Sequence, residues 1–526
     1  MTQPLMLPHR GRTYALMAAA VTVTLTLAVV LPLTLGSAPQ RASGVTEALN
    51  LAPSPGSNLG TGPGTSSPTA SPQPNGSATP QPTPSPAATA TGPRTTQMAP
   101  LVASSAANPR AGGDFGGRPA APGVNLTASD QGITPTTITI GAFIIDFGGA
   151  NGLGAGVTGY DAPTQRKFIE AFRSAVNAGG GIGGRQLLVK TQTVDILNQQ
   201  TMRDACTTFG ETDRVFAVTQ VLGVYGDPIL KCAKDERLPF LATDGAVSSY
   251  YPAAGGYLFT SQPSTRRTIL DMERRLVGLG ELKGKKVGIL DEDGYLKPDF
   301  DALEAALRRD GLTPVRASLS SSDSTTALRD IPTVAANFCQ KGVDYVLLMV
   351  NSLYGSQFVS NIDRSPGCAP AYAVSDFDFA VVGDSFLKNM PASFFRRALA
   401  VTAGTHGNGR VGIAESAGDA QCRSIYESYT GTALDRNSAA DAGYFDALAI
   451  CQVIRNVVSG LTKAGPNPTR AGFVQALASL GSFDNANYSA SHFAPGHTDA
   501  AGDAVRVSQA FGDCLCWKPQ TAFTAP

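Results

Sequence analysis

Residues 137–145, Thr-Ile-Thr-Ile-Gly-Ala-Phe-Ile-Ile, decide the fold. This β-branched run predicts a buried strand, and a glycine-rich loop follows it. Residues 162–178 then carry apolar side chains at helical spacing and end at a run of glycines, which terminates a helix. Residues 186–191 form a second predicted strand. The order strand, helix, strand predicts an α/β fold with a parallel sheet and right-handed crossovers.

The alternation of strands and helices continues along the chain, breaks near Gln262 and then restarts. Two more strands are predicted before the break, at 215–221 and 239–242, and a helix at 265–278 opens the second series. The later strands are predicted at 286–290, 314–318, 345–350 and 371–374. The break predicts two Rossmann-like lobes with parallel sheets, joined by a hinge.

Three later helices, predicted at 419–430, 439–459 and 469–478, have no strands of their own. We therefore expect them to return to the first lobe, so that both lobes are discontinuous in sequence. The predicted boundaries are 132–262 for the first part of lobe 1, 263–410 for lobe 2, 411–486 for the second part of lobe 1, and 487–526 for a C-terminal segment that returns to lobe 2.

The N-terminus predicts export. Residues 1–12 contain basic side chains and form a cytoplasmic n-region, which precedes an uncharged run at 13–36. This run is close to the roughly 20 residues that span a bilayer, which favours a transmembrane anchor. The small residues at 36–38 leave a cleaved signal sequence as the alternative. No cysteine precedes Cys206, so a lipid on an N-terminal cysteine is not expected.

Residues 37–131 are dominated by Pro, Ser, Thr, Ala and Gly. A segment of this composition buries too little apolar surface to offset its conformational entropy, so we predict a disordered linker. Together, the anchor and the linker predict an extracytoplasmic protein that its N-terminal segment holds at the membrane, with the linker separating the folded part from the bilayer. If the segment is cleaved, the protein is secreted.

The charge balance limits the classes of binding partner that the sequence indicates, because 41 basic residues match 41 acidic ones and the formal net charge is zero. Such a neutral chain does not indicate nucleic acid or an anionic surface as a partner. A small-molecule ligand is the partner class that remains.

Eight cysteines, all in the predicted globular part, lack the Cys-x-x-Cys spacing of zinc sites. An even number of cysteines in an exported chain predicts disulfides. Cys206 and Cys232 lie in consecutive predicted helices around one strand, which predicts a bridge between them. Cys339 and Cys368 are arranged in the same way around the strand at 345–350.

The last four cysteines are harder to assign. Cys514 and Cys516 are separated by one residue, a spacing that we expect to hinder a bond between them. The prediction is therefore that they pair with Cys422 and Cys451.

Ligands of open parallel sheets bind outside the carboxyl ends of the strands. The loops at those ends are therefore the candidate binding loops. They cover residues 146–160, 222–226, 243–249, 291–297, 351–354, 375–379 and 404–409.

Two stretches resemble a known family. Residues 132–149, GITPTTITIGAFIIDFGG, and residues 177–195, NAGGGIGGRQLLVKTQTVD, resemble type I periplasmic binding proteins of the leucine/isoleucine/valine-binding branch. The resemblance continues in order to the late helices. It implies two α/β lobes that close over a small ligand, and delivery of that ligand to the permease of an ABC importer.

The resemblance also implies ligand-facing residues. They are Leu222, Val224, Tyr225, Thr243, Asp244 and Gly245 in the first lobe, and Asp291, Tyr295, Ser375, Asp376, Phe377 and Thr405 in or beside the second. The chain departs from amino-acid-binding relatives, which place serines in the loop now holding Val224 and Tyr225 and an acid near His406.

Three aspartates in the candidate loops suggest a ligand that carries a cationic group. Asp146, Asp244 and Asp376 are candidates to meet a cationic group, while Thr243 and backbone N–H groups are candidates to hold a carboxylate. Each aspartate has an alternative role as a helix N-cap or a turn former.

Motifs for catalysis, cofactors and metals are weak. The glycines at 152–159 do not have the G-x-G-x-x-G spacing, and the chain lacks a G-x-S-x-G nucleophile elbow. His492 and His497 flank Pro495-Gly496 and are interpreted as loop residues without a third ligand. We therefore expect no cofactor, no metal and no catalytic residue.

The function predicted from the sequence is that of a non-enzymatic, extracytoplasmic solute-binding protein whose lobes close over a small polar ligand, with an amino-acid-like ligand as one option. An ABC importer would receive that ligand. A ligand-sensing receptor ectodomain of the same fold is the alternative, and an exported hydrolase on an α/β scaffold is the third reading.

Overall fold

The computed structural model describes residues 115, 119–149, 160–196, 198–220, 226–321, 323–378, 384–438 and 443–526. The predicted n-region, the anchor or signal segment and most of the linker lie outside these residues. Within the described ranges, every helix is too short or too polar to cross a membrane.

The first sheet has five parallel strands in the order β2-β1-β3-β4-β5. Its longest pairing joins β1 to β2 from Thr137 opposite Gln186 to Asp146 opposite Asp195. Both faces of β1 are largely buried, which its β-branched sequence favours. The strands are β1 (Thr137–Asp146), β2 (Gln186–Asp195), β3 (Val218–Gln220), β4 (Phe240–Ala242) and β5 (Leu258–Thr260).

The second sheet has seven strands in the order β14-β13-β10-β9-β8-β6-β7. They are β6 (Val287–Glu292), β7 (Val315–Leu319), β8 (Tyr345–Met349), β9 (Ala371–Ser375), β10 (Ala398–Thr402), β13 (Arg506–Phe511) and β14 (Cys516–Pro519). Strands β6 to β9 pair in parallel, as predicted, and β10, which was not predicted as a strand, pairs in parallel with β9. Strand β13 pairs antiparallel with β10, and β14 pairs antiparallel with β13, because the short connection between β13 and β14 can form only a hairpin.

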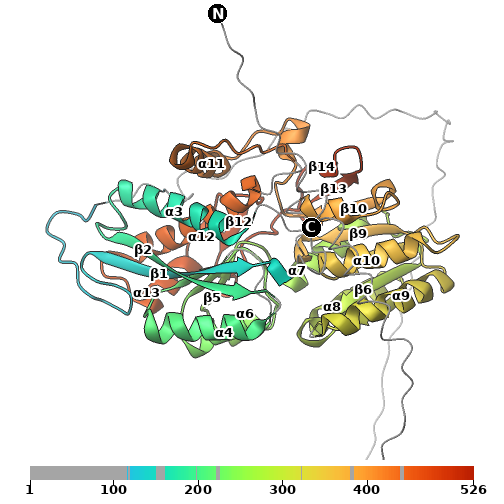
Figure 1. The fold of residues 1–526 in the computed structure, drawn as a ribbon, viewed down its shortest axis with the longest axis horizontal. Helices are drawn as coiled ribbons and strands as arrows, with labels where there is room; N and C mark the ends of the chain where they lie inside the picture. The colour runs from blue at the N-terminus through green and yellow to red at the C-terminus, as the bar shows by residue number, and fades with distance from the viewer. Residues whose placement is uncertain are drawn as a thin grey trace, which may run out of the picture. The chain divides into compact units, whose positions relative to one another are not determined.

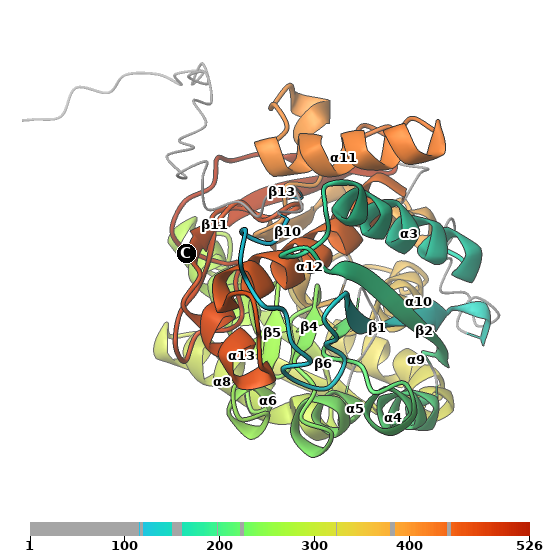
Figure 2. The same ribbon diagram turned by 90° about the vertical axis from the view of Figure 1, so that its left-hand side faces the viewer.

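Helices from both ends of the fold cover the first sheet. Helix α12 is mostly buried and contacts α3, α11, α13, β3 and β4. Figure 2 shows α3, α11, α12 and α13 gathered around this sheet. The helices of this lobe are α3 (Ala162–Ala178), α4 (Gln199–Thr207), α5 (Pro228–Leu230), α6 (Tyr250–Ala253), α11 (Ala417–Thr430), α12 (Gly443–Ala464) and α13 (Arg470–Ala478).

The second sheet carries its own helices. They are α7 (Thr265–Gly278), α8 (Lys297–Arg309), α9 (Ser324–Gln340) and α10 (Ser352–Asp363). Helix α7 packs against α8, and α9 packs against α10 (Figure 1). The fold class is thus confirmed: two α/β lobes with mostly parallel sheets.

Three segments cross between the lobes: residues 261–264, 403–416 and 484–505. They hydrogen-bond to one another along their backbones. The N–H of Thr405 donates to the carbonyl of Asn487 at 2.7 Å, and the N–H of Thr260, at the start of the first crossing, donates to the carbonyl of Thr498 at 2.9 Å. These crossings therefore form one connected hinge, in which movement of one segment strains the others.

Residues 119–131, which the composition assigns to the linker, lie against the first lobe. The guanidinium of Arg185 donates to the carbonyl of Thr127 at 2.9 Å, and the N–H of Thr127 donates to Asn467 at 2.8 Å. Phe115 is buried against Phe172, with ring centroids 5.7 Å apart. The packed part of the chain thus begins before residue 132.

The structure confirms two predicted disulfides and corrects the other two. Cys206–Cys232 and Cys339–Cys368 form as expected. The prediction that Cys514 and Cys516 reach the remaining cysteines was wrong, because Cys422 pairs with Cys451 and Cys514 pairs with Cys516.

Local geometry explains both corrected pairs. Cys422 on α11 and Cys451 on α12 face each other between packed helices, with Cα atoms 5.8 Å apart. Between the last two cysteines, Leu515 takes a left-handed backbone conformation with φ 48°, and this turn brings their Cα atoms to 5.1 Å. A spacing of one residue therefore permits the bond when the backbone turns this sharply.

The two corrected disulfides differ in how much they constrain the unfolded chain. We expect a Cys422→Ala/Cys451→Ala variant to lose about 3 kcal/mol of unfolding free energy, because its bridge closes a loop of 29 residues. A Cys514→Ala/Cys516→Ala variant is the control, because its loop spans only 2 residues and we expect a loss of less than half as much. Urea denaturation measures both values. Equal losses would contradict this explanation.

Candidate functional site

Buried polar side chains gather at the carboxyl ends of the strands, beside the hinge. Asp244 follows β4, Tyr160 precedes α3, and Tyr488 lies on a crossing segment; all three are buried. Burial raises the pKa of the Tyr160 phenol and of the Tyr488 phenol well above the ordinary value; the charge of Asp446 raises the pKa of Tyr160 further, and the charge of Asp244 raises the pKa of both phenols. Both phenols therefore remain protonated, and both lie within electrostatic reach of Asp244.

The loop after β4 is fixed to the hinge. The N–H of Gly245 donates to Gln262 Oε1 at 3.1 Å, and Gln262 Nε2 donates to the Tyr488 hydroxyl at 2.8 Å. A Cβ atom on Gly245 would lie 1.9 Å from the carbonyl oxygen of Pro263, so only glycine fits this approach. Beside it, the hydroxyl of Thr243 donates to Asp244 at 3.3 Å. The predicted residues of this loop are thus brought together.

Asp376 supplies a second carboxylate, from the other lobe. It follows β9, is buried, and accepts hydrogen bonds from the hydroxyl of Thr402 at 2.5 Å and the N–H of Ala403 at 2.6 Å. Burial raises the pKa of its carboxyl to about 6, although these hydrogen bonds oppose the rise. The charge of Asp376, like that of Asp244, raises the pKa of Tyr488. Tyr488 therefore lies within electrostatic reach of one aspartate from each lobe.

A buried arginine offsets part of this negative charge. Arg506, on β13, donates to the carbonyl of His406 at 2.7 Å and to the side chain of Asn408. Burial lowers the pKa of its guanidinium to about 9, while the attraction of Asp376 acts in the opposite direction. Arg506 thus partly balances Asp376.

A small cavity adjoins Tyr160. It has a volume of about 20 Å³, and its polar lining comes from Tyr160, Gln165, Thr219 and Gln220. A space of this size accommodates about one water molecule. In this conformation, the described residues around this cavity leave no room for a larger solute there, so entry of one requires the walls to move.

Two contacts bridge the lobes at the same edge. In the first, the N–H of Ser248, after β4, donates to Asp299 Oδ2 on α8 at 3.0 Å, and Arg266 Nε, within the second lobe, holds the same carboxylate through Oδ1 at 3.0 Å. In the second, the rings of Tyr250 and Tyr295 stack with centroids 6.3 Å apart. These contacts hold the binding loop of the first lobe against α8 of the second.

The other residues predicted to face the ligand from the second lobe do not form one cluster. Asp291 is fully buried and pairs with Arg316 within the β6–β7 layer, and the structure does not group it with Asp244. Ser375 is buried and its hydroxyl oxygen accepts from the N–H of Phe377 at 3.3 Å. The Phe377 ring packs edge-on against Phe300, with centroids 5.4 Å apart. Tyr295 also contacts the first lobe, through the ring of Tyr250.

Two more of the residues predicted to bind the ligand make hydrogen bonds that hold the backbone. Asp146 is exposed and accepts from the N–H of Gly148 at 2.8 Å, the turn-forming role that was its alternative. Thr405 joins the hinge through its N–H. Leu222, Val224 and Tyr225 lie outside the described residues.

Gln262 and Tyr488 were not predicted from the sequence, and Tyr160 was included only as the last residue of the candidate loop 146–160. Each lies in a connecting segment without periodicity, so no pattern predicted a role for its side chain. The one available signal for Gln262 was its position at the break between the two lobes, which predicts a crossing but not a side-chain role. The structure also shows one group of side chains suited to a metal among the described residues, and it consists of other residues than those of this site.

Comparison with known proteins identifies relatives of the fold. The family model described as periplasmic binding protein matches residues 137–511. No curated protein matches the chain significantly. Among solved structures, a fatty acid ABC transporter substrate-binding protein from Thermomonospora curvata is 17% identical, with a TM-score of 0.56 over 76% of this chain and 95% of that chain.

Two further solved structures have similar folds. A solute-binding protein of an ABC transporter from Rhodopseudomonas palustris BisB5, in complex with 3,4-dihydroxybenzoic acid, is 13% identical with a TM-score of 0.54, covering 74% of this chain and 97% of that chain. An ABC transporter substrate-binding protein from Desulfitobacterium hafniense, in complex with Leu, is 18% identical with a TM-score of 0.50, covering 73% and 99%.

Loss of the Asp299 carboxylate should loosen the contact between the lobes. An Asp299→Ala variant removes the acceptor of the Ser248 N–H, so we expect hydrogen exchange in residues 243–249 to accelerate about 10- to 100-fold. An Asp330→Ala variant is the control, because Asp330 is exposed and its ion pair is with the neighbouring, exposed Arg329. Exchange followed by mass spectrometry measures both. Unchanged exchange in the Asp299 variant would contradict the bridging role.

The raised pKa of Asp376 predicts a pH dependence. Because its folded pKa of about 6 lies above the ordinary aspartate value of 3.8, the folded state binds more protons than the unfolded state between these pH values. Its contribution to stability is therefore complete below about pH 4 and declines by up to about 3 kcal/mol as the pH rises through 6. An Asp376→Asn variant should lose this decline relative to the unsubstituted protein.

Urea denaturation at pH 4, 5, 6 and 7 measures this difference. Asp330→Asn is again the control, since that carboxylate is exposed. If Asp376→Asn and the unsubstituted protein show the same slope of stability against pH, the buried carboxyl does not titrate in this window.

Proposed function

Because this chain belongs to the periplasmic binding protein family, we propose that it is a solute-binding protein whose lobes close over a small polar ligand and that it delivers this ligand to an ABC importer. Family membership places the folded part outside the cytoplasm. The proposed role is binding without chemistry. The relatives reported above, which are described as substrate- or solute-binding proteins, support it.

One observation carries the proposal: an aspartate from each lobe lies within electrostatic reach of the same buried tyrosine. Asp244 and Asp376 both raise the pKa of Tyr488, which itself lies on the hinge. A ligand that satisfies both carboxylates would favour the closed state over the open one, which is the requirement for ligand-driven closure.

The side chains favour a ligand with a cationic group. The carboxylate of Asp244 would pair with it, and the phenol rings of Tyr160 and Tyr488 would offer their faces to the same charge. Arg506 partly balances Asp376, so Asp244 is proposed as the main partner. Thr243 and backbone N–H groups would hold a carboxylate at the other end. An amino-acid-like ligand meets both requirements.

The ligands of the structural relatives are consistent with a carboxylate on the ligand of this chain. A fatty acid, 3,4-dihydroxybenzoic acid and Leu are named for the three solved structures, and all three molecules carry one. At these low identities the likeness shows the fold alone, so the cationic group is argued from this chain's own aspartates.

The N-terminal segments complete the proposal. Residues 13–36 would anchor the chain in the membrane, and the linker from residue 37 would give the binding lobes reach toward the permease. The predicted lobe boundaries, 132–262 with 411–486 and 263–410 with 487–526, stand as part of it.

A direct test identifies the ligand and its contact with Asp244. We expect denaturation of the purified protein to release a small molecule with a protonatable nitrogen, recognised by mass spectrometry, and calorimetry to show its binding to ligand-stripped protein. An Asp244→Asn variant should bind it at least 10-fold more weakly, because a buried carboxylate–cation pair loses its charge.

A control variant and two contrary outcomes complete this binding experiment. Asp363→Asn, an exposed position on α10, should bind with unchanged affinity. A ligand recovered chemically altered after incubation would contradict a role without chemistry. Equal affinity of the Asp244 variant would contradict the proposed cation site.

A further inference from the structure

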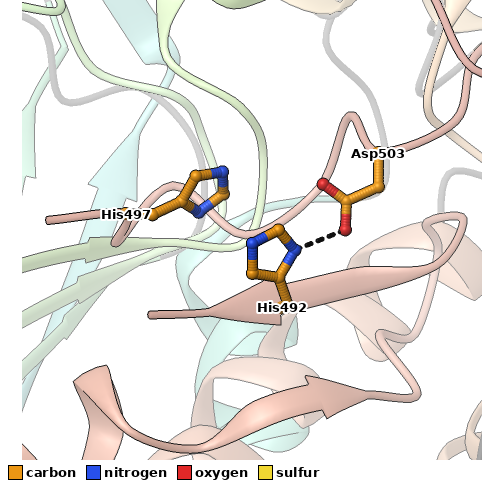
Figure 3. A group of neighbouring side chains, drawn as sticks. All are labelled: His492, His497 and Asp503. Carbon is orange, nitrogen blue, oxygen red and sulfur yellow. Dashed lines mark hydrogen bonds and ion pairs between the residues drawn. The ribbon is translucent and has the colours of Figure 1, made fainter. Parts of the chain in front are cut away.

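Two histidines and an aspartate converge beside the hinge, outside the candidate ligand site. One ligand atom from each of His492, His497 and Asp503 lies within 4.8 Å of the others. His492 lies on β12 (Ser491–Phe493), and Asp503 lies in the loop before β13. Figure 3 shows the two rings and the carboxylate turned toward one another.

The hydrogen bonds of this group leave ring nitrogens available. His492 Nδ1 and Asp503 Oδ2 lie 2.5 Å apart, so the carboxylate orients the ring and leaves Nε2 for another contact. In Figure 3 that second nitrogen of His492 lies on the side of His497. His497 Nδ1 is buried and makes no hydrogen bond within the described residues, and its distance of 3.9 Å to Asp499 is too long for one.

A tight turn of the backbone positions His497 beside His492. The backbones of Ala494 and His497 bond to each other at 2.9 and 2.8 Å, which closes a tight turn around Pro495-Gly496. This turn folds the ring of His497 back over the ring of His492, with centroids 4.2 Å apart and planes inclined by 18°. Two imidazoles at this separation would repel if both were protonated, whereas a shared cation would join them.

The carboxylates beside the two histidines outnumber the permanently charged cations that contact them. Arg267 is the cation beside it, and it bonds mainly to Asp499, through Oδ2 at 3.1 Å and through the carbonyl at 2.6 Å. Its contact with Asp503 is long, at 3.6 Å. Two carboxylates thus share one guanidinium, which leaves room for a further positive charge at Asp503.

We propose that His492, His497 and Asp503 form a zinc site that stabilises the third crossing segment of the hinge. Two imidazoles with one carboxylate are a ligand set of divalent zinc, and a water would take the fourth position of its tetrahedron. The three side chains are 28–34% exposed, so an ion reaches them from solvent. Zinc binding would require side-chain rotations that bring the ligand atoms, now within 4.8 Å of one another, to the tetrahedral spacing of the ion.

The site joins two ends of one segment. Between His492 and Asp503, the backbone bonds to the first crossing: Thr260 donates to Thr498, Ala500 donates to Thr260, and Ser264 donates to the Asp499 carboxylate, at 2.9, 2.8 and 2.8 Å. A metal that ties residues 492, 497 and 503 together therefore also fixes these hinge contacts. The proposed zinc site does not depend on the identity of the solute.

The test measures zinc bound to the full chain after removal of metals with a chelator. Elemental analysis after dialysis against excess zinc should show one ion per chain, and zinc should raise the melting temperature. A His492→Gln/His497→Gln variant should lose this ion, and Asp503→Asn should bind it about 10- to 100-fold more weakly. Calcium, which prefers oxygen ligands, should not be retained.

His406→Gln is the matched control, because it removes another histidine of the folded part and should keep the zinc. Circular dichroism confirms that each variant is folded, and the milder Asp503→Asn keeps the test valid if the double variant is not. Equal zinc content in the unsubstituted protein and the double variant, absence of zinc from the unsubstituted protein, or retention of calcium in its place would overturn the proposal.

Discussion

The hydrogen bonds among the three crossing segments are the constraint on which the rest of the structure depends. The chain passes between its lobes at 261–264, 403–416 and 484–505, and these segments bond to one another rather than only to their own lobes. Tyr488 on the last segment accepts from Gln262 on the first, so the two crossings also share a side-chain contact. Because the lobes turn about this one connected element, any solute that draws the two sheets together must bend it.

This constraint also explains where the polar groups lie. Parallel strands bring their carboxyl ends to one edge, and the crossings run past that edge, so the loop after β4 and the loop after β9 face the hinge. Asp244 and Asp376 occupy those two loops, and both act on Tyr488. The contact of Ser248 with Asp299 sits at the same edge. Binding and hinge movement therefore depend on neighbouring groups, and the proposed zinc site lies on the same crossing segment.

Much of the fold could be predicted from the sequence, because its parallel strands and their helices have strong periodicity. The helix predicted at 265–278 has those bounds in the structure. Strands β13 and β14 could not be predicted in this way, since Arg506–Phe511 mixes polar and apolar residues without a clear pattern, and their pairing depends on the chain returning from the other lobe. The pairing of Cys514 with Cys516 depended on the backbone conformation of one residue, Leu515.

The candidate site was only partly predictable. Asp244 and Asp376 follow strands, so the rule for strand ends identified them. Tyr160, Gln262 and Tyr488 come from connecting segments, and their approach to Asp244 arises from tertiary packing that no local pattern encodes. Asp503 shows the same limit, because it reaches His492 from 11 residues away across a loop.

Small-angle scattering of the protein with and without its solute tests whether a ligand closes the two lobes by bridging their aspartates. We expect the radius of gyration of the ligand-stripped protein to decrease on saturation. A radius that stays the same at saturation, with binding established independently, would contradict it.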